Sequence, residues 1–283
     1  MTKVDQFESV FKAATKTTFQ IQPLSIDKIL VVTDLEREAA ESFGRQVQGF
    51  LGVLKDDSPH WQTVTGADFE NVQQLLDLVA RENPGLICSY RNLESQSWRW
   101  PYSLGEYLDV LTQISGDPVL VLPHPRRSDE QLPQATRSVL AVTDHLTGDD
   151  RLVNHAVHFT DPQGILYLSH IEDEADFERY LEVISKIPTI DTENAQETIG
   201  QQLLKEPQDY IDSCRAALQE SGLRLQIESS VLMGHRISDY KRLIREHSID
   251  LLVLNTKDED QFAMHGLAYP LAVELRDVPM LML

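Results

Sequence analysis

The sequence predicts an α/β protein built from two tandem copies of one parallel-sheet unit. A short apolar strand that ends in Thr-Asp occurs twice, at residues 28–34 and 138–144. Each unit also closes on an apolar strand preceded by a proline, at 117–123 and 278–283. Between these landmarks, apolar runs alternate with helical periodicity, which is typical of parallel strands joined by right-handed crossovers. Repetition at about the length of one domain indicates a duplication.

The composition narrows the class of protein. With 283 residues and 41% hydrophobic residues, the chain can bury two ordinary cores. Its net charge of −20 repels nucleic acid and anionic membrane surfaces, so neither is expected as a partner. Cys88 and Cys214 are the only cysteines and lack metal-like spacing, so we expect two inert reduced thiols. The first residues lack the apolar core of a signal peptide, and no apolar run reaches the ~20 residues of a membrane span, which predicts a cytoplasmic protein.

Residues 1–24 precede the first unit. The apolar residues Val4, Phe7, Val10, Phe11 and Ala14 recur at helical spacing, which predicts an amphipathic helix near residues 3–15. Such a helix could pack on its own domain or cover a partner subunit.

The first domain is expected at residues 25–124. Its strands are predicted at 28–33, 60–65, 86–90 and 118–122, and its helices at 36–54, 69–81 and 104–114. Asn83-Pro84-Gly85 supplies the stop between the second helix and the third strand.

A polar, proline-bounded linker at 125–136 leads to the second domain, 137–283. Its strands are predicted at 138–143, 165–169, 223–232, 250–254 and 278–283. Its helices are predicted at 151–159, 177–187, 195–220, 237–247 and 267–275, the third with a break near Pro207. Residues 187–205 have no counterpart in the first domain and are interpreted as an insertion.

The order of these motifs resembles tandem universal stress protein domains. The resemblance rests on 31–34 (Val-Val-Thr-Asp), 141–144 (Ala-Val-Thr-Asp), 118–123 (Pro-Val-Leu-Val-Leu-Pro) and 249–256 (Ile-Asp-Leu-Leu-Val-Leu-Asn-Thr). It implies a doubly wound, five-stranded parallel sheet in each domain, Rossmann-like and of the adenine nucleotide alpha hydrolase-like kind. Ligands of such sheets bind at the carboxyl ends of the strands, where the strand order reverses.

The resemblance implies tentative nucleotide-pocket positions at these ends. They are Asp34 and Asp144, each after a first strand, the backbone of Ile171 after a second strand, and Asn255 and Gly266. For Asp34 and Asp144 a second interpretation stays open, in which the carboxylate caps the following helix.

The phosphate loop of the family's ATP-binding members is degenerate in both domains. That loop reads Gly-x-x-Gly, nine residues, then Gly-Ser or Gly-Thr, because glycines let the backbone close around phosphates. The second domain keeps Gly266, followed by Leu267, with three carboxylates at 258–260 in place of the glycine turn. The first domain keeps Gly105, followed by Glu106. ATP is therefore not expected as a cofactor in the usual way, whereas AMP or adenosine without a phosphate cradle stays possible.

Other candidate groups remain open. The loop at 98–102 (Trp-Arg-Trp-Pro-Tyr) could stack on a planar ligand, with Arg99 as anion partner, or could plug the first pocket. His170 and the carboxylates after it could hold a metal ion or form a solvated turn. At His170 the solvated turn is favoured and no metal site is predicted, because the end of a strand rarely directs three consecutive residues at one point. His235 and His265 pair with no Ser or Cys nucleophile in a triad order, so no enzyme activity is predicted.

The sequence thus predicts a non-catalytic binding or regulatory protein of the stress response, with an unknown protein partner. The main alternative is an adenine-nucleotide-binding or slowly ATP-hydrolysing protein that uses the second domain's pocket. A third is a sensor of an apolar small molecule at the insertion. The closing strands 118–122 and 278–283 are apolar edges, so we expect them to pair, either within the chain or between two copies in a homodimer.

Overall fold

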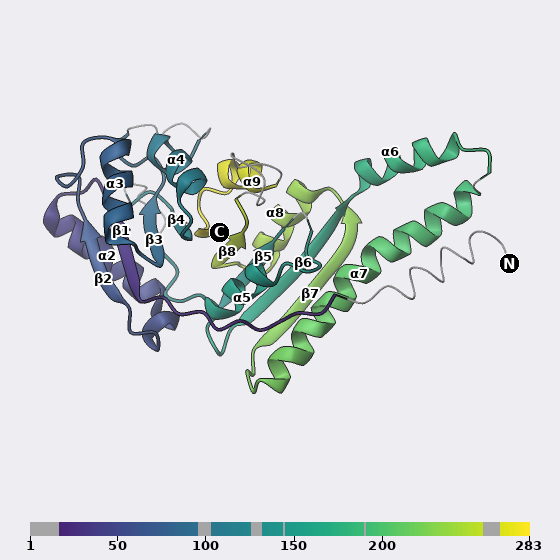
Figure 1. Ribbon diagram of the computed structural model, residues 1–283, viewed down its shortest axis with the longest axis horizontal. Helices are drawn as coiled ribbons and strands as arrows, with labels where there is room; N and C mark the ends of the chain where they lie inside the picture. The colour runs from purple at the N-terminus through teal and green to yellow at the C-terminus, as the bar shows by residue number, and fades with distance from the viewer. Residues whose placement is uncertain (1–16, 96–102, 126–131, 144, 190, 257–266) are drawn as a thin grey trace.

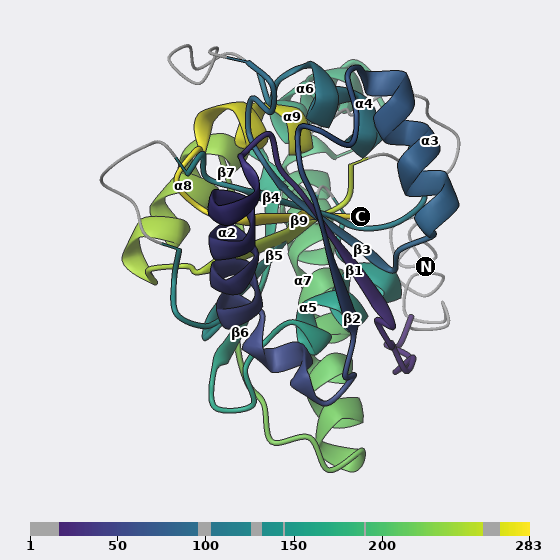
Figure 2. The same cartoon turned by 90° about the vertical axis from the view of Figure 1, so that its left-hand side faces the viewer.

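The strands of both halves of the chain lie in one continuous sheet. The computed structural model describes residues 17–95, 103–125, 132–143, 145–189, 191–256 and 267–283. Nine strands occur among them: β1 (Lys28–Val32), β2 (His60–Val64), β3 (Leu86–Tyr90), β4 (Val119–Leu122), β5 (Ser138–Val142), β6 (Ile165–Asp173), β7 (Gln226–Gly234), β8 (Leu251–Leu254) and β9 (Met280–Met282). Their order in the sheet is β2-β1-β3-β4-β9-β8-β5-β6-β7, with helices on both faces (Figures 1 and 2).

The helices form where the periodicity predicts them. Those of the described residues are α2 (Arg37–Phe50), α3 (Val72–Glu82), α4 (Glu106–Ile114), α5 (Asp150–His158), α6 (Glu174–Ser185), α7 (Thr192–Glu220), α8 (Arg236–Glu246) and α9 (Ala268–Glu274), with a 3-10 turn at Gly52–Lys55. Their ends follow local chemistry. In α3, the Asn71 side chain accepts from the Gln74 N–H, and Asn83 ends the helix in the left-handed region at φ 45°.

The two halves meet at their closing strands. Strands β4 and β9 pair antiparallel, with Val119 opposite Met282 and Val121 opposite Met280, whereas every other neighbouring pair is parallel. Both strands are fully buried. Each also has a neighbour on its other side, so neither leaves a free edge on which a second copy of the chain could add a strand.

The α/β class and the parallel strands are confirmed, but the expectation of two five-stranded sheets is wrong in one half. The second half supplies five strands in the order β9-β8-β5-β6-β7, whereas the first supplies four. The reason lies in the connections. Residues 65–85, between β2 and β3, contain the single helix α3, whereas the chain between β6 and β8 contains α6, α7, β7 and α8.

Two polar contacts reinforce the joint between the halves. Arg91, 3% exposed after β3, donates to the carbonyl oxygen of Ala272 and, at 2.9 Å, to that of Leu275 at the end of α9. A guanidinium at a helix carboxyl end also meets the negative end of the helix dipole. On the other side, His158 Nε2 of α5 lies 2.8 Å from Asp57 Oδ2 of the first half.

The lead-in to the first half lies on the second half. The Phe19 ring contacts Tyr210 of α7 edge-on at 6.4 Å between centroids, and its N–H donates to Ser213 Oγ at 2.9 Å. The Gln22 N–H donates to Asn154 Oδ1 of α5 at 3.0 Å. In Figure 1 this segment runs in purple past α5 to α7. The helix predicted at 3–15 lies outside the described residues.

Helices α6 and α7 form an arm that projects beyond the sheet (Figure 1). The insertion predicted at 187–205 lies in this arm, and the described residues between 182 and 206 are all half-buried or exposed. The predicted break near Pro207 is wrong, because α7 is helical from Thr192 to Glu220 with Pro207 inside it. Among the described residues, no helix is long and apolar enough to cross a bilayer.

Candidate ligand crevices at the carboxyl ends of the strands

Asp34 lies at the end of β1, at the mouth of the first crevice. Its carboxylate accepts from the Tyr90 hydroxyl and, at 3.0 Å, from the Glu94 N–H. Its own N–H donates to the Tyr90 oxygen at 3.0 Å. Helix α2 begins at Arg37 behind Glu36, so Asp34 is not its cap. Asp34 instead fixes the loop after β3 to the end of β1.

The first crevice is strongly acidic. A cavity of about 760 Å³ opens beside Asp34. Five carboxylates line it, against one guanidinium: Asp34, Glu36, Glu41, Asp68 and Glu94, with Arg37. The Arg37 side chain pairs with Glu41 at 3.3 Å, and Asp68 accepts from the Thr65 N–H at 2.7 Å. A phosphate in this cavity would meet mostly like charge.

Gly105, the residue that the first half keeps from the phosphate loop, has a packing role. Its φ is 96°, in the left-handed region, and a Cβ there would lie 2.7 Å from Asn92 Cα. The Asn92 N–H donates to the Leu104 carbonyl at 2.6 Å. The glycine therefore lets the loop before α4 pass close to the loop after β3.

In the second half, Asn255 binds the cap of a helix. Asp149 is the N-cap of α5, since its Oδ1 accepts from the Leu152 N–H at 3.0 Å. Its Oδ2 accepts from the Asn255 side-chain amide at 2.6 Å. Burial raises the pKa of Asp149, and the hydrogen bonds from Leu152 and Asn255 oppose that shift. Asp149 is not among the site residues predicted from the sequence, although it directly precedes the helix that it caps.

Ile171 also has its backbone oxygen occupied. Strand β6 continues past the predicted end at 169, because it pairs with β7 as far as Asp173 opposite Gly234. Ile171 is fully buried, and its carbonyl accepts from Arg236 Nε at 3.1 Å. Arg236 begins α8, so a side chain from the start of this helix occupies the carbonyl of Ile171, a predicted nucleotide-pocket position.

A buried histidine lies beside this backbone. His170 is 1% exposed, and its Nε2 lies 3.2 Å from Glu172 Oε2. The His145 ring stands edge-on to it at 6.4 Å. The hydrogen bond to His170, with Arg236 and His145 nearby, holds the pKa of Glu172 below its usual value. Among the described residues, no cluster of three or more His, Cys, Asp or Glu side chains is placed to hold a metal ion.

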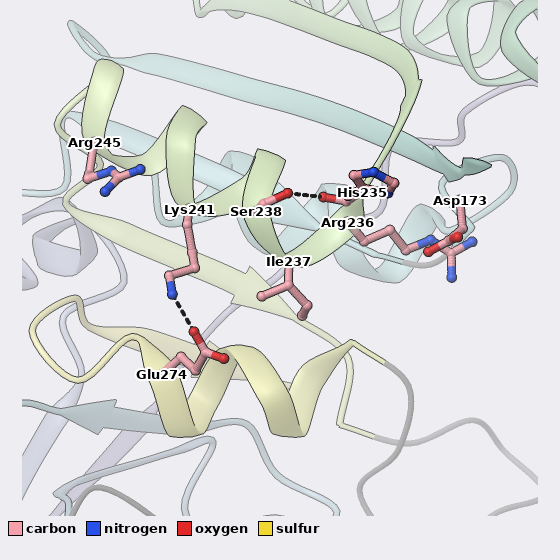
Figure 3. Close-up of a pocket in the computed structure, with 8 residues that line it drawn as sticks. All are labelled: Asp173, His235, Arg236, Ile237, Ser238, Lys241, Arg245 and Glu274. Carbon is pink, nitrogen blue, oxygen red and sulfur yellow. Dashed lines mark hydrogen bonds and ion pairs between the residues drawn. The ribbon is translucent and has the colours of Figure 1, made fainter. Parts of the chain in front are cut away.

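A groove with several cationic side chains opens next to Arg236. Its volume is about 580 Å³, and it runs between α8 and α9. Its charged and polar lining is Asp173, His235, Arg236, Ser238, Lys241, Arg245 and Glu274. Figure 3 shows Lys241 and Glu274 paired across the groove and Arg236 directed toward Asp173. The two halves thus differ in charge at their carboxyl ends, acidic in the first and mixed with several cations in the second.

Several predicted positions lie outside the described residues. They are Asp144, Gly266, His265, the carboxylates at 258–260 and the loop at 98–102 with Arg99. Of the tentative pocket positions, the structure therefore describes Asp34, Ile171 and Asn255. It does not bring all of them together, since Asp34 lies in the first half, whereas Ile171 in β6 and Asn255 after β8 lie in the second half.

Both thiols are buried and unpaired. Burial raises the pKa of Cys88, and burial is also the main cause that raises the pKa of Cys214 to about 12. Neither side chain is a thiolate at neutral pH, which makes both poor nucleophiles.

The fold is that of universal stress protein-like structures. A functionally unknown protein from Pseudomonas aeruginosa aligns at a TM-score of 0.52 and 14% identity, over 91% of this chain and 92% of that one. A protein assigned to the universal stress proteins, from the same organism, aligns at a TM-score of 0.52 and 14% identity, over 91% of this chain and 93% of that one. No protein-family model and no curated protein matches the chain. At this identity the likeness concerns the fold, and a ligand must be argued from the site.

Proposed function

We propose that the chain is a non-catalytic binding or regulatory protein of the stress response, built as a tandem universal stress protein, and that neither half holds ATP in the usual way. One observation carries the proposal. The polar groups at the described pocket positions already bind the chain itself: Asp34 accepts from Tyr90, Ile171 from Arg236, and Asn255 donates to Asp149.

The free-energy cost of nucleotide binding at these positions also supports the proposal. A nucleotide that used these groups would have to replace internal hydrogen bonds, each worth roughly 0.5–1.5 kcal/mol net and more where a charge takes part. In the first crevice it would also approach five carboxylates. Each like-charge contact at 4 Å costs about 1 kcal/mol even in water. We propose a protein partner in place of a nucleotide, and a cytoplasmic location for the pair.

Calorimetric titration with ATP, ADP and AMP, each with and without magnesium, tests this proposal. We expect no saturable heat at millimolar nucleotide. Binding near one site per chain that is lost in Asp144→Ala would refute it, because the second half would then keep a working pocket. Capture of a protein from a lysate would follow only after a negative titration.

A second candidate function rests on the cations of the second half. Arg236, Lys241 and Arg245 line one groove in a chain of net charge −20. This concentration of positive charge favours an adenine nucleotide bound beside α8, with slow ATP hydrolysis as the accompanying activity. AMP binding that is lost in Arg236→Gln and kept in Asp34→Asn would support it, and phosphate release from ATP would measure the hydrolysis.

A further inference from the structure

A third cavity lies where the carboxyl end of α8 meets the amino ends of β6 and β7. Its volume is about 310 Å³. The strand residues that line it fall at 165–169 in β6 and 228–230 in β7, before the middle of each strand or at it. The predicted nucleotide positions of this half, in contrast, follow the carboxyl ends of strands or lie near them. The cavity is therefore a separate site from the one that the resemblance implies.

The register of β6 and β7 brings the polar groups of this cavity together. Tyr167 lies directly opposite Glu228, and Ser169 lies opposite Ser230. Residues two apart along a strand share one face of the sheet, so these four side chains lie on the same face. Burial raises the pKa of Tyr167, and the Glu228 carboxylate raises it further, as expected for a phenol beside a negative charge.

Two rings form an aromatic wall in the cavity. The Tyr167 and His247 rings lie 4.5 Å apart between centroids and are inclined by 30°. Tyr167 is half-buried, His247 is exposed, and both line the cavity. A stacked pair of this kind offers a flat π surface to a planar ligand, and its negative face attracts a cation.

The inner wall of the cavity is apolar. Leu140, Leu243 and Ile249 are only 1%, 8% and 7% exposed. A wall of buried aliphatic side chains with a few polar groups is the usual lining of a small-molecule site. The volume lies at the low end of the roughly 300–1,000 Å³ that such sites have, which favours a small ligand.

The charge of the lining selects the sign of the ligand. Of the described residues that line the cavity, Glu228 is the one carboxylate, and none is lysine or arginine. Glu228 Oε1 accepts from the neutral Gln226 side-chain amide at 2.9 Å, which leaves its negative charge in place. The groove at the other end of α8, in contrast, holds Arg236 and Lys241. An anion is thus disfavoured in the cavity, and a cation is favoured.

We propose that this cavity binds a small planar organic cation, such as an aromatic amidinium or a protonated aromatic amine. Its ring stacks on the wall of Tyr167 and His247, and its hydrocarbon part contacts the buried aliphatic side chains. Its charged N–H groups donate to Glu228, because hydrogen bonds between charged partners are the strong ones.

An NMR titration of the full chain with benzamidinium tests the site, and benzamide serves as the neutral analogue of nearly the same shape. We expect saturable shifts of the backbone amides at 166–169, 228–230 and 247. Benzamide should bind at least about fivefold more weakly, because it lacks the charge that Glu228 attracts. The position of the shifts is decisive, since the acidic first crevice also attracts cations. Equal affinity for both compounds, or shifts confined to other parts of the chain, would overturn the proposal.

Matched variants separate the site from the general acidity of the chain. Glu228→Gln should weaken benzamidinium binding at least about fivefold, whereas Glu193→Gln removes the same charge from an exposed position in α7 and should leave it unchanged. Tyr167→Leu should weaken the binding of both compounds, whereas Tyr180→Leu, at a residue 57% exposed on α6, should not. An equal loss in Glu193→Gln and Glu228→Gln would refute the proposal, because the attraction would then come from the chain as a whole.

Discussion

Arg91 is the residue through which the joint between the halves is best tested. Its buried guanidinium donates to the Ala272 and Leu275 carbonyls at the carboxyl end of α9. In Arg91→Met the side chain keeps its apolar stem and loses both donors. Hydrogen bonds from a charged group contribute about 1.5–3 kcal/mol each, and the carbonyls left without this donor remain partly buried. We therefore expect the free energy of unfolding to fall by roughly 3–5 kcal/mol.

Urea denaturation followed by circular dichroism measures this change. The matched control is Arg37→Met, because Arg37 is 90% exposed and pairs only at the surface with Glu41, so no measurable change is expected. A loss below about 1 kcal/mol in Arg91→Met, at an unchanged dependence on urea, would show that the carbonyls find other donors. Arg91 would then not be the residue that ties α9 to the first half.

Three further changes test local features. Gly105→Ala should lower the free energy of unfolding by about 1–3 kcal/mol, because φ there is 96° and the added Cβ has no room, whereas Gly116→Ala, with open space, should be nearly neutral in a thermal melt. Cys88 and Cys214 should react with a thiol reagent at least ~100-fold more slowly in the native protein than in urea, since burial raises the pKa of both; fast native labelling of either would contradict their burial. The folded-state pKa of Glu172 lies below its usual 4.5, so the ionised carboxylate adds stability that is present above pH 4.5 and lost as the pH falls. The difference in unfolding free energy between wild type and Glu172→Gln should therefore close in acid. A difference that does not depend on pH would refute this assignment.

The helices and strands of the fold could be predicted from the local sequence pattern. The strand before Asp34 and the stop at Asn83 were predicted from adjacent residues, because apolar runs and turn residues act over a few positions. The prediction of a helix break at Pro207 was wrong because it, too, used only adjacent residues. A proline predicts a break from local rules, but here it is buried within a helix that packs on the sheet, and packing outweighs propensity.

The candidate sites needed information that no local pattern contains. Tyr90 reaches Asp34 from 56 positions away in the chain, and Arg236 reaches Ile171 from 65. Asp149 caps α5, because that helix begins at Asp150, well past the end of β5 at Val142. The nucleotide roles of Asp34, Asp144, Ile171, Asn255 and Gly266 stay predictions.

The antiparallel pairing of β4 with β9 has a consequence for ligands. Within each half all strands run in the same direction. Because the two halves join through one antiparallel pair, the strands of the first half run opposite to those of the second. The carboxyl ends of the two halves therefore open at opposite edges of the sheet. Strands of five residues span about 15 Å. A small molecule bound in the acidic crevice cannot touch one bound beside α8, and the chain can present two unlike surfaces to two different partners at once.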